Sequence, residues 1–346
     1  MTTYNDSDTP VVSNRGIWGW MFFDWAAQPF FTLLLTFFFA RYFATGVVGD
    51  GATAQSLWGL MLTVSGIAIA LLSPILGSVA DATGPRKPWI AGFMLLAVLG
   101  AAALWWAVPN APHSTIVLTL VAFGIAMIGV EFSTVFNNAM MPDLVPRERL
   151  GRLSGSAWAL GYVGGVVALV IVLVFMASVT PGASTTIAGL TPVFGLADIP
   201  GGSDRATGIL TAVWMSVFVI PLFLFTPDTP KRVHVKGAVS KGLSELKQTI
   251  INLPKQRSLF AYLGSSMFYR DALSGLYGFG GIYAGGVLEW SATKLGIFGI
   301  LTALAGAIGA WIGGRLDDRF GPKSVVTVSI LMLILASIII VTTDKS

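Results

Sequence analysis

The sequence contains no cysteine and only two histidines among its 346 residues. Without cysteine there can be no disulfides, thiolate nucleophiles or cysteine-ligated metals. Both histidines, His113 and His234, lie outside the long apolar segments, so the sequence offers no histidine-based metal or catalytic site. We expect no cofactor and no metal. An enzyme is the least favoured class, because no nucleophile and base occur together on a polar scaffold.

Charged residues are also scarce. They make up 11% of the chain, whereas 54% of the residues are hydrophobic, and an average soluble domain contains about 25% charged residues. This composition is typical of a membrane protein. The net charge of +4 and the isoelectric point near 9.4 come from basic residues in short loops, which indicates membrane topology and not nucleic-acid binding.

Nine apolar segments are long enough to cross a bilayer as helices. They cover about residues 17–43, 57–79, 88–108, 114–138, 154–178, 207–226, 258–285, 293–314 and 324–342. The polar segment before the first of them carries Asp6 and Asp8 and has no short apolar core. We therefore expect no removable signal peptide, and the first apolar segment is a retained span.

The loops on the two sides of the predicted membrane differ strongly in basic residues. If the N-terminus is cytoplasmic, sixteen lysines and arginines fall on the cytoplasmic side, and the other side has only Arg41, Arg205, Lys294 and Lys345. This positive-inside asymmetry predicts a cytoplasmic N-terminus. The compact chain without long soluble tails indicates a multi-pass protein of a bacterial cytoplasmic (inner) membrane.

A short polar turn occurs twice, each time between two apolar segments. The first repeat turn contains Gly77, Asp81, Gly84, Arg86 and Lys87. The second repeat turn, 237 residues further on, contains Gly314, Asp318, Gly321 and Lys323. Internal repetition of this kind in a membrane chain indicates a transporter built from two related halves.

The residues of the first repeat turn have a clear physical logic. Asp81 lies at the C-terminal end of a predicted helix, where a negative charge is unfavourable unless a positive partner holds it, and Arg86 is the nearest candidate. Gly84 ends the helix. Gly77, one turn before Asp81, leaves room for another helix to approach closely.

Few ionisable or amide side chains lie deep within the spans, and the deeply placed charges are confined to the first, fourth and seventh. They are Asp24 and Gln28 in the first span, Glu131, Asn137 and Asn138 in the fourth, and Arg270 and Asp271 with Tyr269 in the seventh. Charged groups in the hydrocarbon layer are costly and persist mainly where they line a cavity or pair with one another.

These side chains define a candidate solute site. With a rise of 1.5 Å per residue, Asp24 and Glu131 each lie about 10 Å from the cytoplasmic end of their span, and Arg270 lies about 18 Å deep. Arg270 would then pair with Asp24 or Glu131. One cation beside carboxylates suits a zwitterionic solute, and Glu131 is a candidate proton carrier. The alternative is a set of salt bridges that joins helices without touching a solute.

Small residues four positions apart predict close helix packing. They occur as Gly151/Gly155, Gly161/Gly165, Gly281/Gly285 and Ala305/Gly309/Gly313. Three domains follow from the spacing of the spans: a six-helix bundle at 1–226, a basic linker at 227–257 and a three-helix bundle at 258–346. Leu243, Leu246 and Ile250 recur in the linker at helical spacing, which favours an amphipathic helix on the inner leaflet. The alternative interpretation is that the linker only connects the two bundles.

The repeat turn resembles the signature loop of the major facilitator superfamily, in which the Asp and the Arg form a gating latch. Further stretches resemble the autophagy-related vacuole effluxer-like branch of that superfamily. They are Phe23–Ala26, Phe136–Leu144, Gly155–Gly165, Tyr269–Ala272 and Phe279–Ala284. Ala272 departs from the branch, which usually has Gly after the Arg-Asp pair.

The resemblance implies an all-α, major facilitator-type bundle with a six-helix N-terminal half. It implies twelve spans, of which helices one, four, seven and ten line the cavity, so we expect a chain truncated after the ninth span with an incomplete C-terminal half. The alternative is a C-terminal half that is naturally short. The eukaryotic members of the branch are associated with amino-acid efflux from the vacuole. The ninth span, from Val325 to Thr342, has the composition of a lipid-facing helix.

We therefore predict a secondary active transporter of a small polar solute. Amino acids are the favoured solutes, and efflux is the favoured direction. It would work by alternating access and be coupled to protons. The partners expected are the solute, protons and the lipid bilayer, with no nucleic acid. The alternative is a non-transporting membrane protein or an inactive product of a shortened transporter gene.

Overall fold

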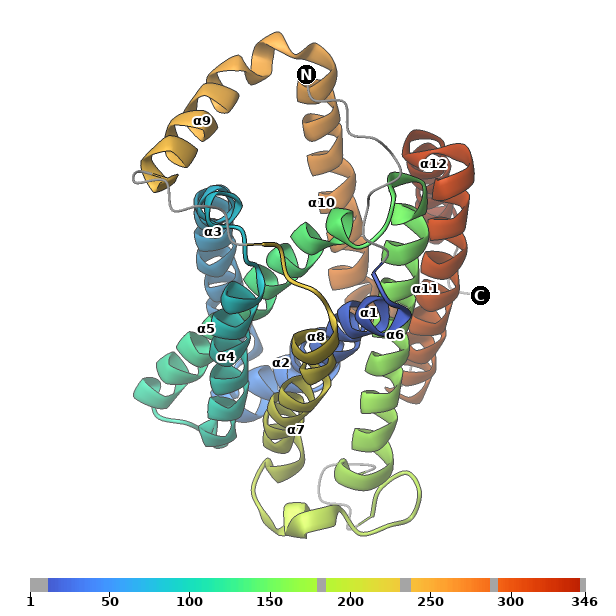
Figure 1. Cartoon of the computed structure of the whole chain (residues 1–346). Helices are drawn as coiled ribbons and strands as arrows, with labels where there is room; N and C mark the ends of the chain where they lie inside the picture. Colours follow the sequence, from blue (N-terminus) through green and yellow to red (C-terminus); the bar gives the residue numbers. More distant parts are fainter. Residues whose placement is uncertain (1–11, 179–184, 231–237, 287–291, 343–346) are drawn as a thin grey trace.

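The structure is a computed structural model that describes residues 12–178, 185–230, 238–286 and 292–342. The acidic N-terminal segment with Asp6 and Asp8 lies outside these described residues, as do Lys231, Arg232 and Lys236 of the linker. All regular elements in the described part of the chain are helices (Figure 1).

The longer helices follow one another along the chain, and the longest connection is that between α6 and α7. They are α1 (Asn14–Pro29), α3 (Gly51–Thr83), α4 (Lys87–Ala103), α5 (His113–Met140), α6 (Leu150–Ile171), α7 (Gly202–Phe218), α9 (Ala238–Asn252), α10 (Arg257–Gly286), α11 (Ala292–Phe320) and α12 (Pro322–Thr342). Two short helices, α2 (Phe39–Tyr42) and α8 (Ile220–Phe225), prolong the first and the sixth predicted spans.

Eight helical segments in the described part of the chain are long and apolar enough to cross a membrane. They coincide with eight of the nine predicted spans. α10, a helix of 30 residues, occupies the place of the seventh predicted span, but its glycines, serines and charged residues make it less apolar than the others. The all-α membrane bundle predicted from the sequence is therefore confirmed.

The first span is irregular after Pro29. Proline lacks a backbone N–H and disturbs the hydrogen bonds of the helix around it, and the chain continues as π-helical turns over Phe30–Phe37 and Phe43–Val48. In this stretch the N–H of Phe38 donates to the carbonyl of Leu33, five residues back. The span therefore extends to Val48, beyond the predicted end near residue 43.

α1 lies in the middle of the first six spans and packs on α6, α7 and α8. Its buried side chains include Trp20, Phe23 and Ala26, each at most 1% exposed. Among the same spans, α4 and α5 pack against each other, and Gly129 of α5 lies against the backbone of α4. A Cβ atom at Gly129 would lie 2.6 Å from the carbonyl oxygen of Phe93, so only glycine permits this backbone contact.

α6 and α11 run side by side (Figure 1) and join the first six spans to the later helices. They meet through glycines. A Cβ at Gly155 would collide with the carbonyl oxygen of Ala310, and one at Gly314 with the carbonyl oxygen of Gly151. The predicted role of Gly151 and Gly155 as a packing seam is confirmed.

Among the described residues, the seam predicted in α11 is wrong for two of its members. Cβ atoms at Gly309 and Gly313 would meet no described atom within 4 Å, because α6 packs on another face of α11. That face carries Gly314 and Gly306, and Gly306 lies against the ring of Tyr162. The side chains around Gly281 and Gly285 lie outside the described residues.

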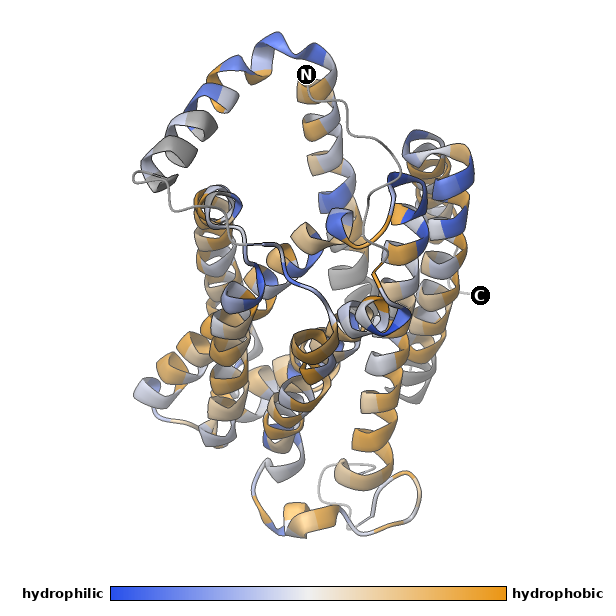
Figure 2. Ribbon diagram, in the orientation of Figure 1, coloured by the Kyte–Doolittle hydropathy of each residue, from blue (hydrophilic) through white to orange (hydrophobic). Residues whose placement is uncertain are grey.

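Two outer helices complete the arrangement. Figure 2 shows α12 as hydrophobic along most of its length. The apolar stretch of α12 has no residues buried within the described structure, as predicted for a lipid-facing helix. The helix predicted in the linker is present as α9. It packs against α3 and lies beside one end of α3 (Figure 1).

Candidate solute site and gating turns

The first repeat turn forms the ion pair expected from the sequence. Arg86 Nη2 lies 2.5 Å from Asp81 Oδ1, and Gly84 ends α3 with a φ of 97°, a conformation that favours glycine. The guanidinium of Arg86 is buried and also donates to the carbonyl of Gly84, whereas the Asp81 side chain is 70% exposed. A Cβ at Gly77 would meet nothing within 4 Å, so no helix in the described part of the chain uses the room that it leaves.

Asp228, just beyond α8, holds the first repeat turn from the other side. Its carboxylate accepts hydrogen bonds from the backbone N–H groups of Arg86, at 2.8 Å, and Lys87, at 3.2 Å. These donors lie at the N-terminal end of α4 and have no partner within the helix, so Asp228 acts as a remote N-cap. The ammonium of Lys87 in turn donates to the carbonyl of Phe223. The turn is thereby tied to the end of the sixth span.

The second repeat turn keeps the positive φ of the first at its glycine, but it is shorter and its aspartate has another partner: α12 begins at Pro322, directly after Gly321, whereas three residues separate α3 from α4. Gly321 has a φ of 79°, as in the first copy. Asp318 accepts a hydrogen bond of 3.1 Å from the backbone N–H of Arg152 in the first turn of α6, and its other oxygen lies 3.5 Å from Arg152 Nε. Lys323, the counterpart of Arg86, is exposed and forms no ion pair among the described residues.

Together these contacts form one polar layer at a single end of the bundle. Thr229 Oγ1 donates to Asp143 at the end of α5, which connects the first repeat turn to the loop before α6. We call this end the basic side and define it by Arg86, Arg152 and Asp318. The N-terminus of α1 belongs to it as well, because Thr226 Oγ1 donates to the carbonyl of Gly16.

Asp24 and Gln28 lie at the contact between α1 and the glycines of α6. A Cβ at Gly161 would be 3.2 Å from Asp24 Cβ, and one at Gly165 would be 2.8 Å from Gln28 Cγ. The predicted seam at Gly161 and Gly165 is thus confirmed, and α1 is its partner. Asp24 and Gln28 are both half-buried.

The fourth-span candidates divide between two environments. Glu131 is half-buried on α5, and Asn138 is exposed. Asn137 is fully buried, and its side-chain amide has no hydrogen-bond partner within the described structure. Its backbone carbonyl accepts a 2.7 Å hydrogen bond from Trp20 Nε1, which joins α5 to α1.

The seventh-span candidates lie on α10. The Tyr269 hydroxyl accepts a 3.3 Å hydrogen bond from Ser266, and Arg270 and Asp271 are exposed. The ion pairs within the described residues are those of Arg86 and Arg152. The predicted pairing of Arg270 with Asp24 or Glu131 is therefore not formed in this structure.

Sequence reasoning missed Asp228, Arg152 and Trp20 as partners of the candidate residues. Asp228 follows a span and resembles an ordinary turn aspartate, and the helix that it caps begins more than 140 residues earlier in the chain. Arg152 is one of several arginines in its loop. For both residues the only local signal is a polar side chain next to a helix end.

The fold and the repeated turns define an all-α, multi-pass membrane protein of the major facilitator type. The chain belongs to the family of vacuole effluxer Atg22 like proteins, whose sequence profile matches residues 44–342. It is also 24% identical over 333 residues to the uncharacterized MFS-type transporter YxiO of Bacillus subtilis (strain 168), an alignment that covers 92% of this chain and 71% of the relative. The family and this relative place the chain in the class of MFS-type transporters.

Proposed function

We propose that this transporter carries a small zwitterionic solute, an amino acid or a close analogue, by proton-coupled alternating access in the efflux direction. The moving bodies are the helices of residues 1–226 and those of 258–346, connected by the linker 227–257. The membrane is a bacterial cytoplasmic membrane with the basic side of the protein in the cytoplasm. The bacterial relative and the excess of basic residues on one side support this orientation.

Asp24 and Glu131 carry this proposal. Both are carboxylates on membrane-spanning helices, both are half-buried, and neither forms an ion pair in the described part of the chain. An unpaired acid at this depth is costly, so its usual role is to bind a cation or a proton. In this scheme one carboxylate holds the ammonium of the solute and Glu131 carries the proton.

The remaining candidates complete the solute site. Arg270 supplies the cation for the solute carboxylate when α10 closes on the first bundle, and Gln28, Asn137, Asn138, Tyr269 and Asp271 offer hydrogen bonds around it. The amide of Asn137, which has no partner among the described residues, supports this assignment, because a buried polar group without a partner is costly and is expected to bind water or a ligand.

The crossing of α6 and α11 supports the rocking motion. The two halves touch there through glycine backbones, and Asp318 spans the contact to Arg152. Smooth glycine surfaces permit two helices to change their crossing angle with little side-chain repacking. In the proposed cycle, the two repeat turns act as a gating latch that opens and closes with this crossing.

Transport by the purified chain in liposomes tests the proposal. Radiolabelled amino acids are presented with and without a pH gradient, to wild type and to Glu131→Gln. We expect gradient-driven flux in the wild type and flux equal to that of empty liposomes in the variant, because glutamine cannot carry a proton. The matched control is Glu148→Gln, an exposed glutamate in the loop before α6.

Two outcomes would contradict the proposal in different ways. Undiminished gradient-driven flux in Glu131→Gln would remove Glu131 from the mechanism. Wild-type flux equal to that of empty liposomes across the whole panel, in correctly inserted protein, would favour a non-transporting membrane protein.

A further inference from the structure

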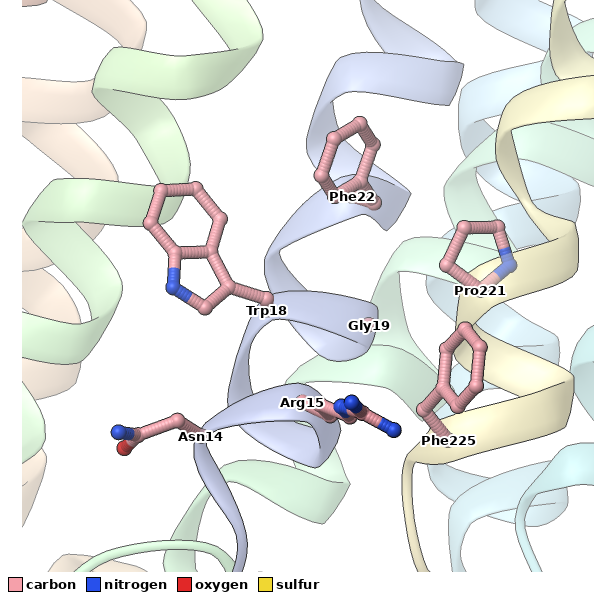
Figure 3. A pocket seen from close by; sticks show the side chains of 7 residues that line it. All are labelled: Asn14, Arg15, Trp18, Gly19, Phe22, Pro221 and Phe225. Atoms are coloured by element: carbon pink, nitrogen blue, oxygen red, sulfur yellow. The ribbon is translucent and has the colours of Figure 1, made fainter.

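A groove of about 430 Å³ lies between the start of α1 and the end of α8, on the basic side of the bundle. Figure 3 shows its walls: Trp18 and Phe22 project from successive turns of α1, and Pro221 and Phe225 come from α8. Gly19 forms the floor, where α1 and α8 are in backbone contact.

The two ends of the groove differ in polarity. Asn14 and Arg15 stand at the rim in the first turn of α1, and both are exposed. Trp18 and Phe22 follow at three and seven residues from Arg15, on the same face of the helix. With a rise of 1.5 Å per residue, Phe22 lies about 10 Å deeper than Arg15. The groove is thus cationic at its mouth and aromatic below.

Arg15 has no carboxylate partner within the described structure. The ion pairs among the described residues involve Arg86 and Arg152 only, so none of the described carboxylates lies within 4 Å of the Arg15 guanidinium. The lining residues of the groove include no acidic side chain. The exposed guanidinium can therefore accept an external anion.

The aromatic part of the groove continues deeper as a ladder of rings. The ring centroids of Trp18 and Phe22 are 6.4 Å apart, those of Phe22 and Trp25 are 6.2 Å apart, and Trp25 stacks on Trp214 of α7 at 5.6 Å. Trp18 is 53% exposed and Phe225 49% exposed. On a membrane-spanning helix, such exposed rings at the polar edge contact lipid.

The residues that line this groove do not include those of the candidate solute site. Asp24 and Gln28 pack at Gly161 and Gly165 of α6, beyond the groove, and the ring ladder reaches α6 only at its deep end, where Trp25 packs on Gly164. The groove therefore offers no carboxylate for the ammonium of a zwitterion. Its combination of one cation with an apolar track matches an amphiphile that carries a negative charge.

We propose that the groove between α1 and α8 binds one anionic phospholipid from the leaflet on the basic side. Arg15 pairs with the phosphate, Asn14 hydrogen-bonds to the headgroup, and an acyl chain lies along Trp18, Phe22 and Phe225. Anionic headgroups are recognised in this way by basic positions at the cytoplasmic ends of membrane helices.

Photo-crosslinking of the full chain in lipid nanodiscs tests the proposal. One preparation contains phosphatidylglycerol with a photoreactive acyl chain, and the other contains phosphatidylcholine with the same chain. We expect phosphatidylglycerol adducts, located by mass spectrometry, on the peptides that contain Trp18–Trp25 or Phe225. Arg15→Gln should reduce them about fivefold, which corresponds to about 1 kcal/mol for one basic residue at the surface.

The controls separate the charge from the apolar track. Arg41→Gln removes an exposed arginine near the other end of the same span and should leave the adducts unchanged. Trp18→Leu keeps Arg15 and should lower the yield by removing a ring contact. Equal labelling by the two lipids, or an Arg15→Gln pattern identical to wild type, would overturn the proposal. Displacement of the lipid by inorganic phosphate would also overturn it, because Arg15 would then bind a free anion.

Discussion

Asp81 and Asp318 occupy the same position in the two repeat turns, yet their carboxylates have different partners. Asp81 pairs with Arg86 inside its own turn and stays 70% exposed, whereas Asp318 is 9% exposed and accepts a hydrogen bond from the first turn of α6. A carboxylate at a helix N-terminus satisfies an unpaired N–H and interacts favourably with the helix dipole. Asp318 therefore stabilises the contact between the two halves.

Replacing Asp318 with alanine should weaken this contact. Loss of a capping carboxylate costs about 1 kcal/mol, so we expect a lower apparent melting temperature for Asp318→Ala in detergent, measured by intrinsic fluorescence. Lys323→Ala is the matched control, because Lys323 belongs to the same turn and forms no ion pair within the described residues. Equal melting temperatures for wild type and Asp318→Ala would show that the cap contributes nothing.

At the scale of elements, α6 presents two glycine pairs to two different helices. Gly151 and Gly155 face α11, and Gly161 and Gly165 face α1. One helix thus contacts both the other half of the protein and the span that carries Asp24. A change in the α6–α11 crossing therefore bears directly on a helix that adjoins the candidate solute site.

Two glycine-to-alanine substitutions in α11 distinguish the effect of the α6–α11 contact on stability from the effect of helix propensity. Gly314→Ala places a Cβ against the backbone of Gly151 and Gly155, which cannot move aside as a side chain can. We expect overpacking to destabilise the protein by about 1–3 kcal/mol. Gly309→Ala adds a Cβ that meets no described atom within 4 Å, so it should be neutral or stabilising by up to about 1 kcal/mol.

Thermal unfolding of both variants in detergent measures the difference. A melting temperature that falls for Gly314→Ala and does not fall for Gly309→Ala confirms the crossing. Equal changes in the two variants would mean that α6 does not pack on Gly314 in the protein in solution.

At the scale of the whole molecule, the polar layer on the basic side connects the ends of most spans. Asp228 ties the sixth span to α4, Thr229 reaches Asp143 after α5, and Asp318 reaches α6. This end of the bundle is thus extensively cross-connected by polar side chains, and its basic loops predict that it lies in the cytoplasm.

Cysteine labelling tests this orientation, and the absence of native cysteine makes the labelling unambiguous. Glu148→Cys places a thiol in an exposed loop on the basic side, and Ser114→Cys places one in an exposed position at the opposite end of α5. In intact cells we expect a membrane-impermeant maleimide to label Ser114→Cys only, with Glu148→Cys labelled after permeabilisation. The reverse pattern would invert the topology.

The sequence by itself determined the class of the protein and the positions of its helices. Runs of apolar residues predict spans because burying a helical backbone in lipid depends on local composition. The repeat turns were visible for the same reason, since Gly84 and Gly321 end their helices through a local backbone requirement. The glycine pairs of α6 also marked close packing before any partner helix was known.

Only the tertiary structure decided which partners these residues have. Asp318 turns to Arg152 and not to Lys323, and Asp228 caps a helix that precedes it by about 140 residues. Gly309 meets no neighbour among the described residues although its spacing predicted a seam. Arg270 forms no ion pair with Asp24 in this structure. The physical reason is common to all four: each depends on how helices distant in the chain cross one another, and side-chain spacing within one helix contains no information about that crossing.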